Sequence, residues 1–204
     1  MEILALLLFT FSSTITPGPN NIMMFSSGLN YGIKRSLPHL FGIFIGFPTM
    51  VVAVGLGIGF LFERFPVLHL ILKIVGSLYL LYLAYKIATT RASIEEKKSS
   101  KPFTFLQAAL FQWVNPKAWV LALTSVATFT ALNGNYMLAV AIIAAAFLLA
   151  SLPCVGFWLC SGHVARNFVK SNLALMMFNW VMAFLLVLSL FPVFKELGLL
   201  MLGH

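Results

Sequence analysis

The sequence contains no aspartate, and its five acidic residues are all glutamates. They are Glu2, Glu63, Glu95, Glu96 and Glu196, and none lies in the middle of a hydrophobic segment. A relay of carboxylates that carries protons through a membrane is therefore not expected. The sequence also lacks an HExxH motif and the paired aspartates of an intramembrane protease. We therefore expect no enzymatic activity.

Charged residues are scarce altogether. They make up 9% of the 204 residues, whereas apolar residues make up 61% and the mean hydropathy is +0.99. Soluble proteins carry about 25% charged residues, so the composition predicts an all-α membrane protein with one domain over residues 1–204. The net charge of +8 arises mostly from basic residues in short loops. That placement favours membrane lipids over nucleic acid as partners.

Cysteine is also rare. Cys154 and Cys160 form no metal-binding or redox motif, so we expect reduced packing residues and neither a metal nor a cofactor. At the N-terminus, Glu2 stands where a signal peptide would be basic, so the first hydrophobic segment is expected to remain as a membrane span.

Six segments are long and apolar enough to cross a membrane, which takes about 20 residues. They are residues 3–25, 37–62, 66–88, 103–131, 136–159 and 173–194. The loops on one side carry the basic residues Lys34, Arg35, Lys86, Arg91, Lys97, Lys98, Lys101, Arg166 and Lys170. The other side has only Arg64 and Lys195. The positive-inside rule then predicts a cytoplasmic position for the basic loops and outward-facing termini.

A polar linker, residues 89–102, divides the six spans into three and three. Because three is odd, a second half at residues 103–204 enters the membrane in the opposite direction to a first half at residues 1–88. This predicts a 3+3 inverted repeat, the plan of many secondary carriers. An unrelated bundle of six helices would have the same span count.

Two proline-containing motifs interrupt the first and fourth spans at matching depths. The first is Thr16-Pro17-Gly18-Pro19-Asn20-Asn21, and the second is Val114-Asn115-Pro116-Lys117. A proline removes a backbone donor and clashes with the carbonyl four residues earlier, so it frees polar backbone within the bilayer. Paired interruptions in two halves indicate the binding site of a transporter. The alternative is a pair of plain kinks, because membrane helices tolerate proline.

The chemistry of the breaks suits a zwitterion such as an α-amino acid. Amides at the start of a half-helix attract an anion, and unpaired carbonyls attract an ammonium group. Thr16, Asn20, Asn21, Gln112 and Asn115 add neutral polar groups. The asparagines have the alternative role of satisfying the broken backbone alone.

Lys117 is the one deeply placed charge. It could pair with a substrate carboxylate or exchange a proton, or it could cap the carbonyls freed by the break. Lys73 is close enough to its span end to snorkel. Ion coupling, if present, has to use Lys117, a histidine such as His39 or His163, backbone carbonyls or the substrate itself, although both histidines border the basic loops, where a histidine usually has no special role. Gly42 and Gly46 form a GxxxG pair that permits close helix packing, within one chain or in a homodimer.

These motifs identify a family resemblance. The TPGPNN motif, Gly32-x-Lys34-Arg35-Ser36, Gly42-x-x-x-Gly46-Phe47, Gly76-Ser77-Leu78-Tyr79-Leu80 and Phe111-Gln112-Trp113-Val114-Asn115-Pro116-Lys117 resemble the LysE/RhtB family of bacterial amino-acid exporters. Residues 86–89, 125–129 and 161–163 look most like the branch that exports cysteine and O-acetylserine.

The resemblance implies an efflux carrier for a small amino acid in the bacterial inner membrane, driven by the proton gradient. The expected substrate site remains the one that the two breaks indicate: Thr16, Pro17, Gly18, Pro19, Asn20, Asn21, Gln112, Asn115, Pro116 and Lys117. An aspartate that some members carry in the early spans is absent here. A passive channel or a membrane assembly subunit remains the alternative function.

Overall fold

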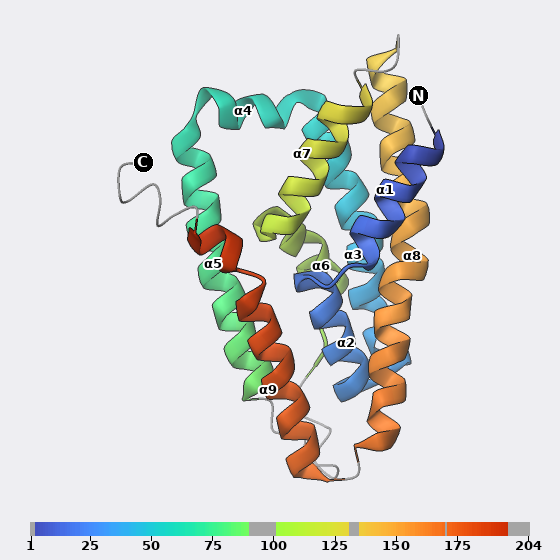
Figure 1. Cartoon of the computed structure of the whole chain (residues 1–204), viewed down its shortest axis with the longest axis vertical. Coiled ribbons are helices and arrows are strands. Elements are labelled where there is room, and N and C mark those ends of the chain that lie inside the picture. The colour runs from blue at the N-terminus through green and yellow to red at the C-terminus, as the bar shows by residue number, and fades with distance from the viewer. Residues whose placement is uncertain (1–2, 90–100, 131–134, 170, 196–204) are drawn as a thin grey trace.

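The computed structural model describes residues 3–89, 101–130, 135–169 and 171–195, and this part of the chain is helical with no strand. Its elements, in order, are α1 (Ile3–Ile15), α2 (Pro19–Tyr31), α3 (Ile33–Ala53), a π-helical turn (Val54–Ile58), α4 (Gly59–Arg64), α5 (Pro66–Ala88), α6 (Phe105–Phe111), a 3₁₀ turn (Gln112–Val114), α7 (Pro116–Thr130), α8 (Tyr136–Phe168) and α9 (Asn172–Leu188). Figure 1 shows them as an elongated bundle.

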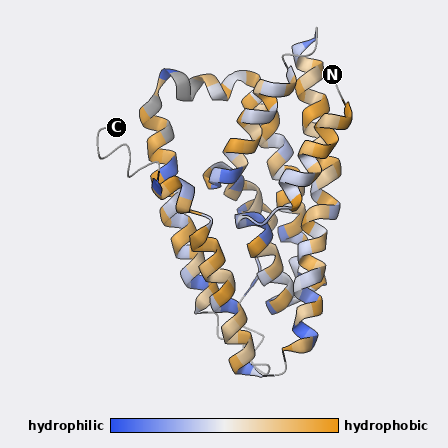
Figure 2. Ribbon diagram, in the orientation of Figure 1, coloured by the Kyte–Doolittle hydropathy of each residue, from blue (hydrophilic) through white to orange (hydrophobic). Residues whose placement is uncertain are grey.

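Four stretches of the described chain are helices long and apolar enough to cross a membrane. They are Ile33–Ile58, Leu70–Ala88, Tyr136–Phe168 and Asn172–Lys195, and they match the second, third, fifth and sixth expected spans. The first and fourth expected spans are each divided, into α1 with α2 and into α6 with α7. The expected interruptions are therefore present at both proline motifs. Hydrophobic residues make up much of these helices, as the colouring of the ribbon in Figure 2 shows.

Several expected boundaries were wrong because amphipathic helix ends continue beyond the apolar runs. The α2 helix runs past the expected end at residue 25 to Tyr31, and only Gly32, at φ 76°, separates it from α3. The α8 helix continues to Phe168, so most of the expected loop at residues 161–172 is helical. Of the expected linker at residues 89–102, residues 90–100 lie outside the described part of the chain.

Small residues bring the helices of this one chain close together. A Cβ on Gly28 would meet the carbonyl oxygen of Leu159, and one on Gly162 would meet that of Phe25, so α2 and α8 touch at the backbone. Gly42 and Gly46 face α6 in the same way. The GxxxG pair therefore serves a contact within the chain. The α5 and α9 helices pack along each other, and in Figure 1 the upper part of α5 stands away from α7.

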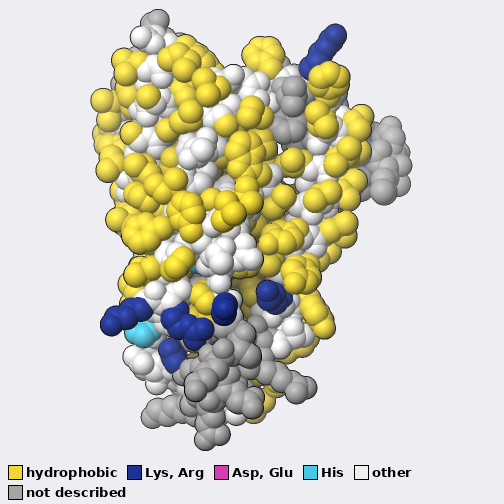
Figure 3. Space-filling model, turned by 180° about the vertical axis from the view of Figure 1, so that it is seen from behind, with side chains coloured by type: hydrophobic (Ala, Val, Ile, Leu, Met, Phe, Trp, Pro, Cys, Tyr) yellow, Lys and Arg dark blue, Asp and Glu magenta, His cyan; other side chains and the backbone are white. Residues whose placement is uncertain are grey.

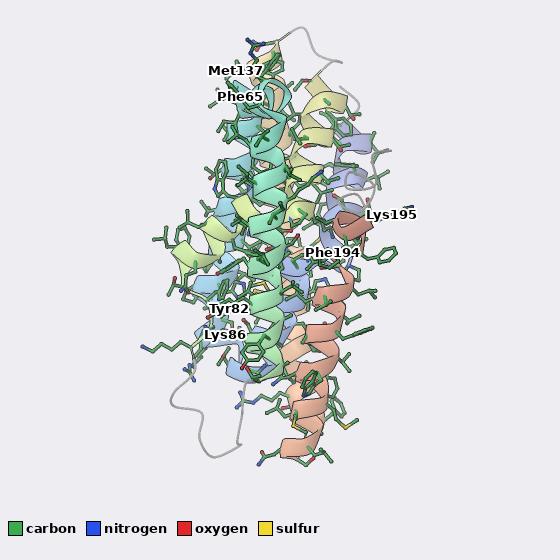
Figure 4. All side chains as sticks on the ribbon, turned by 90° about the vertical axis from the view of Figure 1, so that its left-hand side faces the viewer. Phe65, Tyr82, Lys86, Met137, Phe194 and Lys195 are labelled. Carbon is green, nitrogen blue, oxygen red and sulfur yellow. The ribbon has the colours of Figure 1, made fainter. Side chains whose placement is uncertain are left out.

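Basic side chains gather at one end of the molecule, hereafter the basic end, as Figure 3 shows. Lys34 and Arg35 lie in the first turn of α3, and Arg166 lies in the last turn of α8. Figure 4 shows Lys86 toward that end of α5 and Phe65 at the opposite end. Lys101 lines the same cavity as Lys86. The other expected members, Arg91, Lys97, Lys98 and Lys170, lie outside the described residues.

Candidate functional site

The first break separates α1 from α2 near the middle of the bundle. The α1 helix ends at Ile15, and α2 begins at Pro19 after an extended Gly18. Both Thr16 and Gly18 precede a proline, and residues in that position disfavour helical geometry. The first amides of α2 lack intrahelical acceptors, and the first regular bond runs from the Ile22 amide to the Gly18 carbonyl, at 2.9 Å.

Asn21 restores part of the hydrogen bonding lost at this break. Its Nδ2 donates to the carbonyl oxygen of Thr14 at 2.7 Å and to that of Thr16 at 2.8 Å. The side chain is 3% exposed, so neither carbonyl depends on water for a partner. The alternative role foreseen for the asparagines, satisfying the broken backbone, therefore holds for Asn21.

Lys117 connects the two breaks. It lies in the first turn of α7, and its Nζ donates to the Thr16 carbonyl and the Thr16 hydroxyl, each at 2.8 Å, and to the Pro17 carbonyl at 3.4 Å. A Cβ on Gly18 would lie 2.7 Å from Cδ of Lys117, so the glycine leaves room for the lysine. The ammonium thus caps carbonyls of the other half of the chain, the structural alternative foreseen from the sequence.

A second contact between the halves is an amide pair. Nδ2 of Asn20 donates to Oε1 of Gln112 at 2.8 Å, and Nε2 of Gln112 donates to Oδ1 of Asn20 at 3.2 Å. Gln112 is fully buried and also donates to the Ala108 carbonyl at 2.9 Å. This pair joins the start of α2 to the turn that follows α6, whereas the Lys117 contact joins the end of α1 to the start of α7.

The second break is built around Asn115, which is extended at φ −84° and ψ 110° and precedes Pro116. Its Oδ1 accepts a hydrogen bond from the Lys117 amide at 3.1 Å, and its carbonyl accepts one from Ala118, also at 3.1 Å. Asn115 therefore starts α7 and fixes the backbone of Lys117. Pro116 suits the first helical position, where no amide donor is needed.

Of the ten expected site residues, Pro17, Pro19 and Pro116 line a larger cavity, and Thr16 and Gln112 bond to Lys117 and Asn20. The other five line a small pocket. It is lined by Ser13, Thr14, Gly18, Asn20, Asn21, Ile43, Phe47, Asn115, Lys117, Ala118, Leu121, Ser151 and Val155. Ser13, Thr14 and Ser151 were not among the residues expected at the site. The run of hydroxyl residues at positions 12–14 was the available signal for the first two. Thr14 Oγ1 is buried without a hydrogen-bond partner among the described residues. The pocket volume is about 40 Å³. Because each water occupies about 10–15 Å³ of such a volume, the pocket holds about three waters.

Two larger cavities lie on either side of the breaks. The basic-end cavity, about 480 Å³, lies between α2, α3, α5 and the start of α6. The far-end cavity, about 630 Å³, lies between the breaks, α5, α7 and the end of α9. The described residues of their linings include basic and neutral polar side chains but no acidic one. Within the described residues, no group of three His, Cys, Asp or Glu side chains could hold a metal ion.

His39 lies buried inside a helix, whereas the sequence placed it at the border of a basic loop. His39 is 2% exposed, and its Nδ1 lies 2.9 Å from Oγ of Ser27 on α2. It lines the basic-end cavity. The helix that was expected to begin at residue 37 begins at Ile33, so His39 lies inside it. Lys73, set aside because of its position near a span end, lines the far-end cavity with Lys117.

Comparison with known proteins gives one family. The LysE type translocator family matches residues 11–193. The cysteine/O-acetylserine efflux protein of Klebsiella pneumoniae subsp. pneumoniae is 33% identical over 187 residues, covering 90% of this chain and 92% of that protein. The protein of the same name from Salmonella paratyphi A is 32% identical over 167 residues, which cover 78% of this chain and 81% of that protein. The protein of this name from Escherichia coli O1:K1 is 29% identical over 165 residues, which cover 79% of this chain and 83% of that protein.

No solved structure matches the chain significantly. The family match extends over both breaks and all of the long helices, and the relatives align with most of their length. The chain therefore belongs to the LysE type translocator family.

Proposed function

We propose that this protein is a secondary-active efflux carrier that exports a small neutral amino acid, such as cysteine or O-acetylserine, across the bacterial inner membrane. The observation that carries the proposal is the contact of the two breaks, with a cavity on each side. The names of the relatives, cysteine/O-acetylserine efflux proteins, supply the substrate class. The basic end is the cytoplasmic end by the positive-inside rule, so the termini face outward.

The substrate site is the pocket at the breaks. The amino-acid carboxylate binds Lys117 Nζ, replacing the Thr16 and Pro17 carbonyls as acceptors, and also reaches the free amides at the start of α2. The ammonium binds the carbonyls thus released and Oδ1 of Asn20. The pocket has to widen for this, because its present volume of about 40 Å³ holds only about three waters.

Alternating access follows from the two contacts between the halves. Parting the Asn20–Gln112 pair opens the pocket toward the basic-end cavity, and parting Lys117 from Thr16 opens it toward the far-end cavity. The halves are residues 1–88 and 103–204, joined by the linker at residues 89–102, and they form a 3+3 inverted repeat. Support comes from chain direction: in Figure 1, α1 and α2 descend toward the basic end, whereas α6 and α7 ascend from it.

Counterflow in reconstituted vesicles tests the proposal. Vesicles loaded with unlabelled cysteine or O-acetylserine should take up the labelled compound transiently and with saturation. A passive pore would give uptake that rises linearly with concentration and shows no stimulation by internal substrate. Pro17→Ala and Asn20→Ala should abolish counterflow while the protein still inserts. Pro153→Ala, an exposed proline inside the continuous α8 helix, is the control and should transport normally.

Wild-type transport by both Pro17→Ala and Asn20→Ala would refute the placement of the site. Absence of counterflow for every amino acid tested with the wild-type protein would refute the carrier itself.

A further inference from the structure

His39 is the centre of a buried polar cluster in the basic-end cavity. Its ring packs against that of Phe103, with centroids 5.2 Å apart, and Nδ1 is 2.9 Å from Oγ of Ser27. Within the described residues, Nε2 has no hydrogen-bond partner, although His39 lines the cavity. An imidazole can carry a proton on either ring nitrogen, so a ring that lines a cavity has the chemistry to exchange one.

The charged surroundings of His39 are basic. Lys86 on α5 and Lys101 before α6 line the same cavity, as does Tyr31 on α2. On α8, His163 and Arg166 lie beside Gly32 at the start of α3, outside the cavity lining. Lys117 on α7 lies at the breaks. Among the residues that the structure describes, no carboxylate lines either cavity or the pocket. Imidazole is the side chain whose unperturbed charge change falls between pH 5 and 8, so His39 is the natural proton acceptor here.

We propose that His39, held by Ser27, is the proton-binding site that couples export to the proton gradient. This rests on the proposed carrier function. The neutral imidazole takes up one proton and becomes an imidazolium, and it returns the same proton to the cytoplasm through the basic-end cavity. No other group is oxidised, reduced or consumed.

The hydrogen bond to Ser27 gives the proton a mechanical effect. In the neutral tautomer whose Nδ1 accepts the Ser27 hydroxyl, Nε2 already carries a hydrogen, so the proton taken up has to add at Nδ1. Ser27 lines the same cavity: its Oγ takes a proton from the cavity while its own hydroxyl proton passes to Nδ1, which then donates to Oγ. The Ser27 hydroxyl then turns to a carbonyl one turn earlier in α2, as helical serines do. The same helix carries Asn20 at its start, so protonation of His39 acts on the element that forms the Asn20–Gln112 pair.

The position along α3 links His39 to the substrate pocket. Ile43 and Phe47, which line the pocket at the breaks, follow His39 at intervals of one helical turn, about 6 Å each. Proton and substrate therefore occupy neighbouring positions along one face of α3. The proton enters from the pocket side when the carrier faces outward and leaves into the basic-end cavity when it faces the cytoplasm.

The test separates exchange from coupling in reconstituted vesicles. With the interior one pH unit more acidic than the medium, a one-to-one antiporter accumulates labelled substrate up to about tenfold. His39→Gln and His39→Asn, neutral at every pH, should show no accumulation beyond equilibrium but should keep counterflow, which needs no proton movement. His163→Gln is the matched control and should keep both activities.

Accumulation by either His39 variant would overturn the proposal. Loss of counterflow in both variants would overturn it too, since His39 would then be a structural residue. Wild-type counterflow without any response to the pH gradient would refute proton coupling and leave the carrier intact. No wild-type counterflow at all would instead refute the proposed function.

Discussion

Lys117→Met is the sharpest test of whether the deep charge binds substrate or only holds the breaks together. Methionine keeps most of the length of the side chain but removes the three donors of the ammonium. In the structure these donors bond two oxygens of Thr16 at 2.8 Å and the Pro17 carbonyl at 3.4 Å. All three contacts are lost in the variant.

The size of the effect follows from the strength of charged hydrogen bonds, about 1.5–3 kcal/mol each. If a substrate carboxylate takes the place of these carbonyls, removing the ammonium costs the complex one or more such bonds. The loss of a single such bond lowers Vmax/KM for transport by about 10- to 150-fold. Because the bond forms on binding, we expect most of the loss as a higher KM.

The assay is the concentration dependence of counterflow in vesicles, normalised to the amount of inserted protein. Lys73→Met is the control, because it removes one charge from the same far-end cavity and should leave KM nearly unchanged. An unchanged Vmax/KM in Lys117→Met, accompanied only by a lower unfolding temperature in detergent, would refute the substrate role. Lys117 would then be a cap on the carbonyls of the first break and nothing more.

Three further variants test the packing around the site. Gly18→Ala should cost about 1–3 kcal/mol of stability and reduce counterflow, because the added Cβ lies 2.7 Å from the Lys117 side chain; normal activity would show that the lysine moves freely. Asn21→Ala strands two carbonyls at the end of α1 and should lower the free energy of unfolding by about 1–3 kcal/mol, measured by denaturation in detergent. Gly162→Val should prevent the close approach of α8 to α2 and reduce the yield of folded protein. Gly156→Ala on the same helix, where a Cβ meets nothing within 4 Å, should have no such effect, and equal yields would contradict the packing argument.

Local chemistry made the breaks predictable from the sequence. Residues that precede a proline avoid the helical region, and both Thr16 and Gly18 do so within one short stretch. Asn115 does the same before Pro116, and the structure interrupts the helix at both places. The partners across the breaks were not predictable, because the contact of Lys117 with Thr16 joins residues 101 apart. Nothing in the spacing of either motif says which oxygen the ammonium reaches.

His39 was misjudged because hydropathy locates the apolar run and not the helix. The polar residues at the start of α3 belong to the helix, and the imidazole packs against Ser27 of α2 and Phe103, which precedes α6. Tertiary contacts also decide that α8 continues to Phe168. Its last turns hold small residues that fit against α2. The apolar pattern of a membrane span does not indicate such contacts between helices.

Proline alone does not make the site, as the continuous helices of the same chain show. Pro48 lies within α3 and Pro153 within α8, and neither helix is interrupted there. The difference lies in the polar side chains that accompany each proline. At the first break, Asn21 and Lys117 satisfy the carbonyls that the interruption leaves exposed, so the backbone remains open without the cost of unpaired groups in the bilayer. These same donors and acceptors are the ones that a zwitterion needs, so the proposed substrate site uses the groups that stabilise the break.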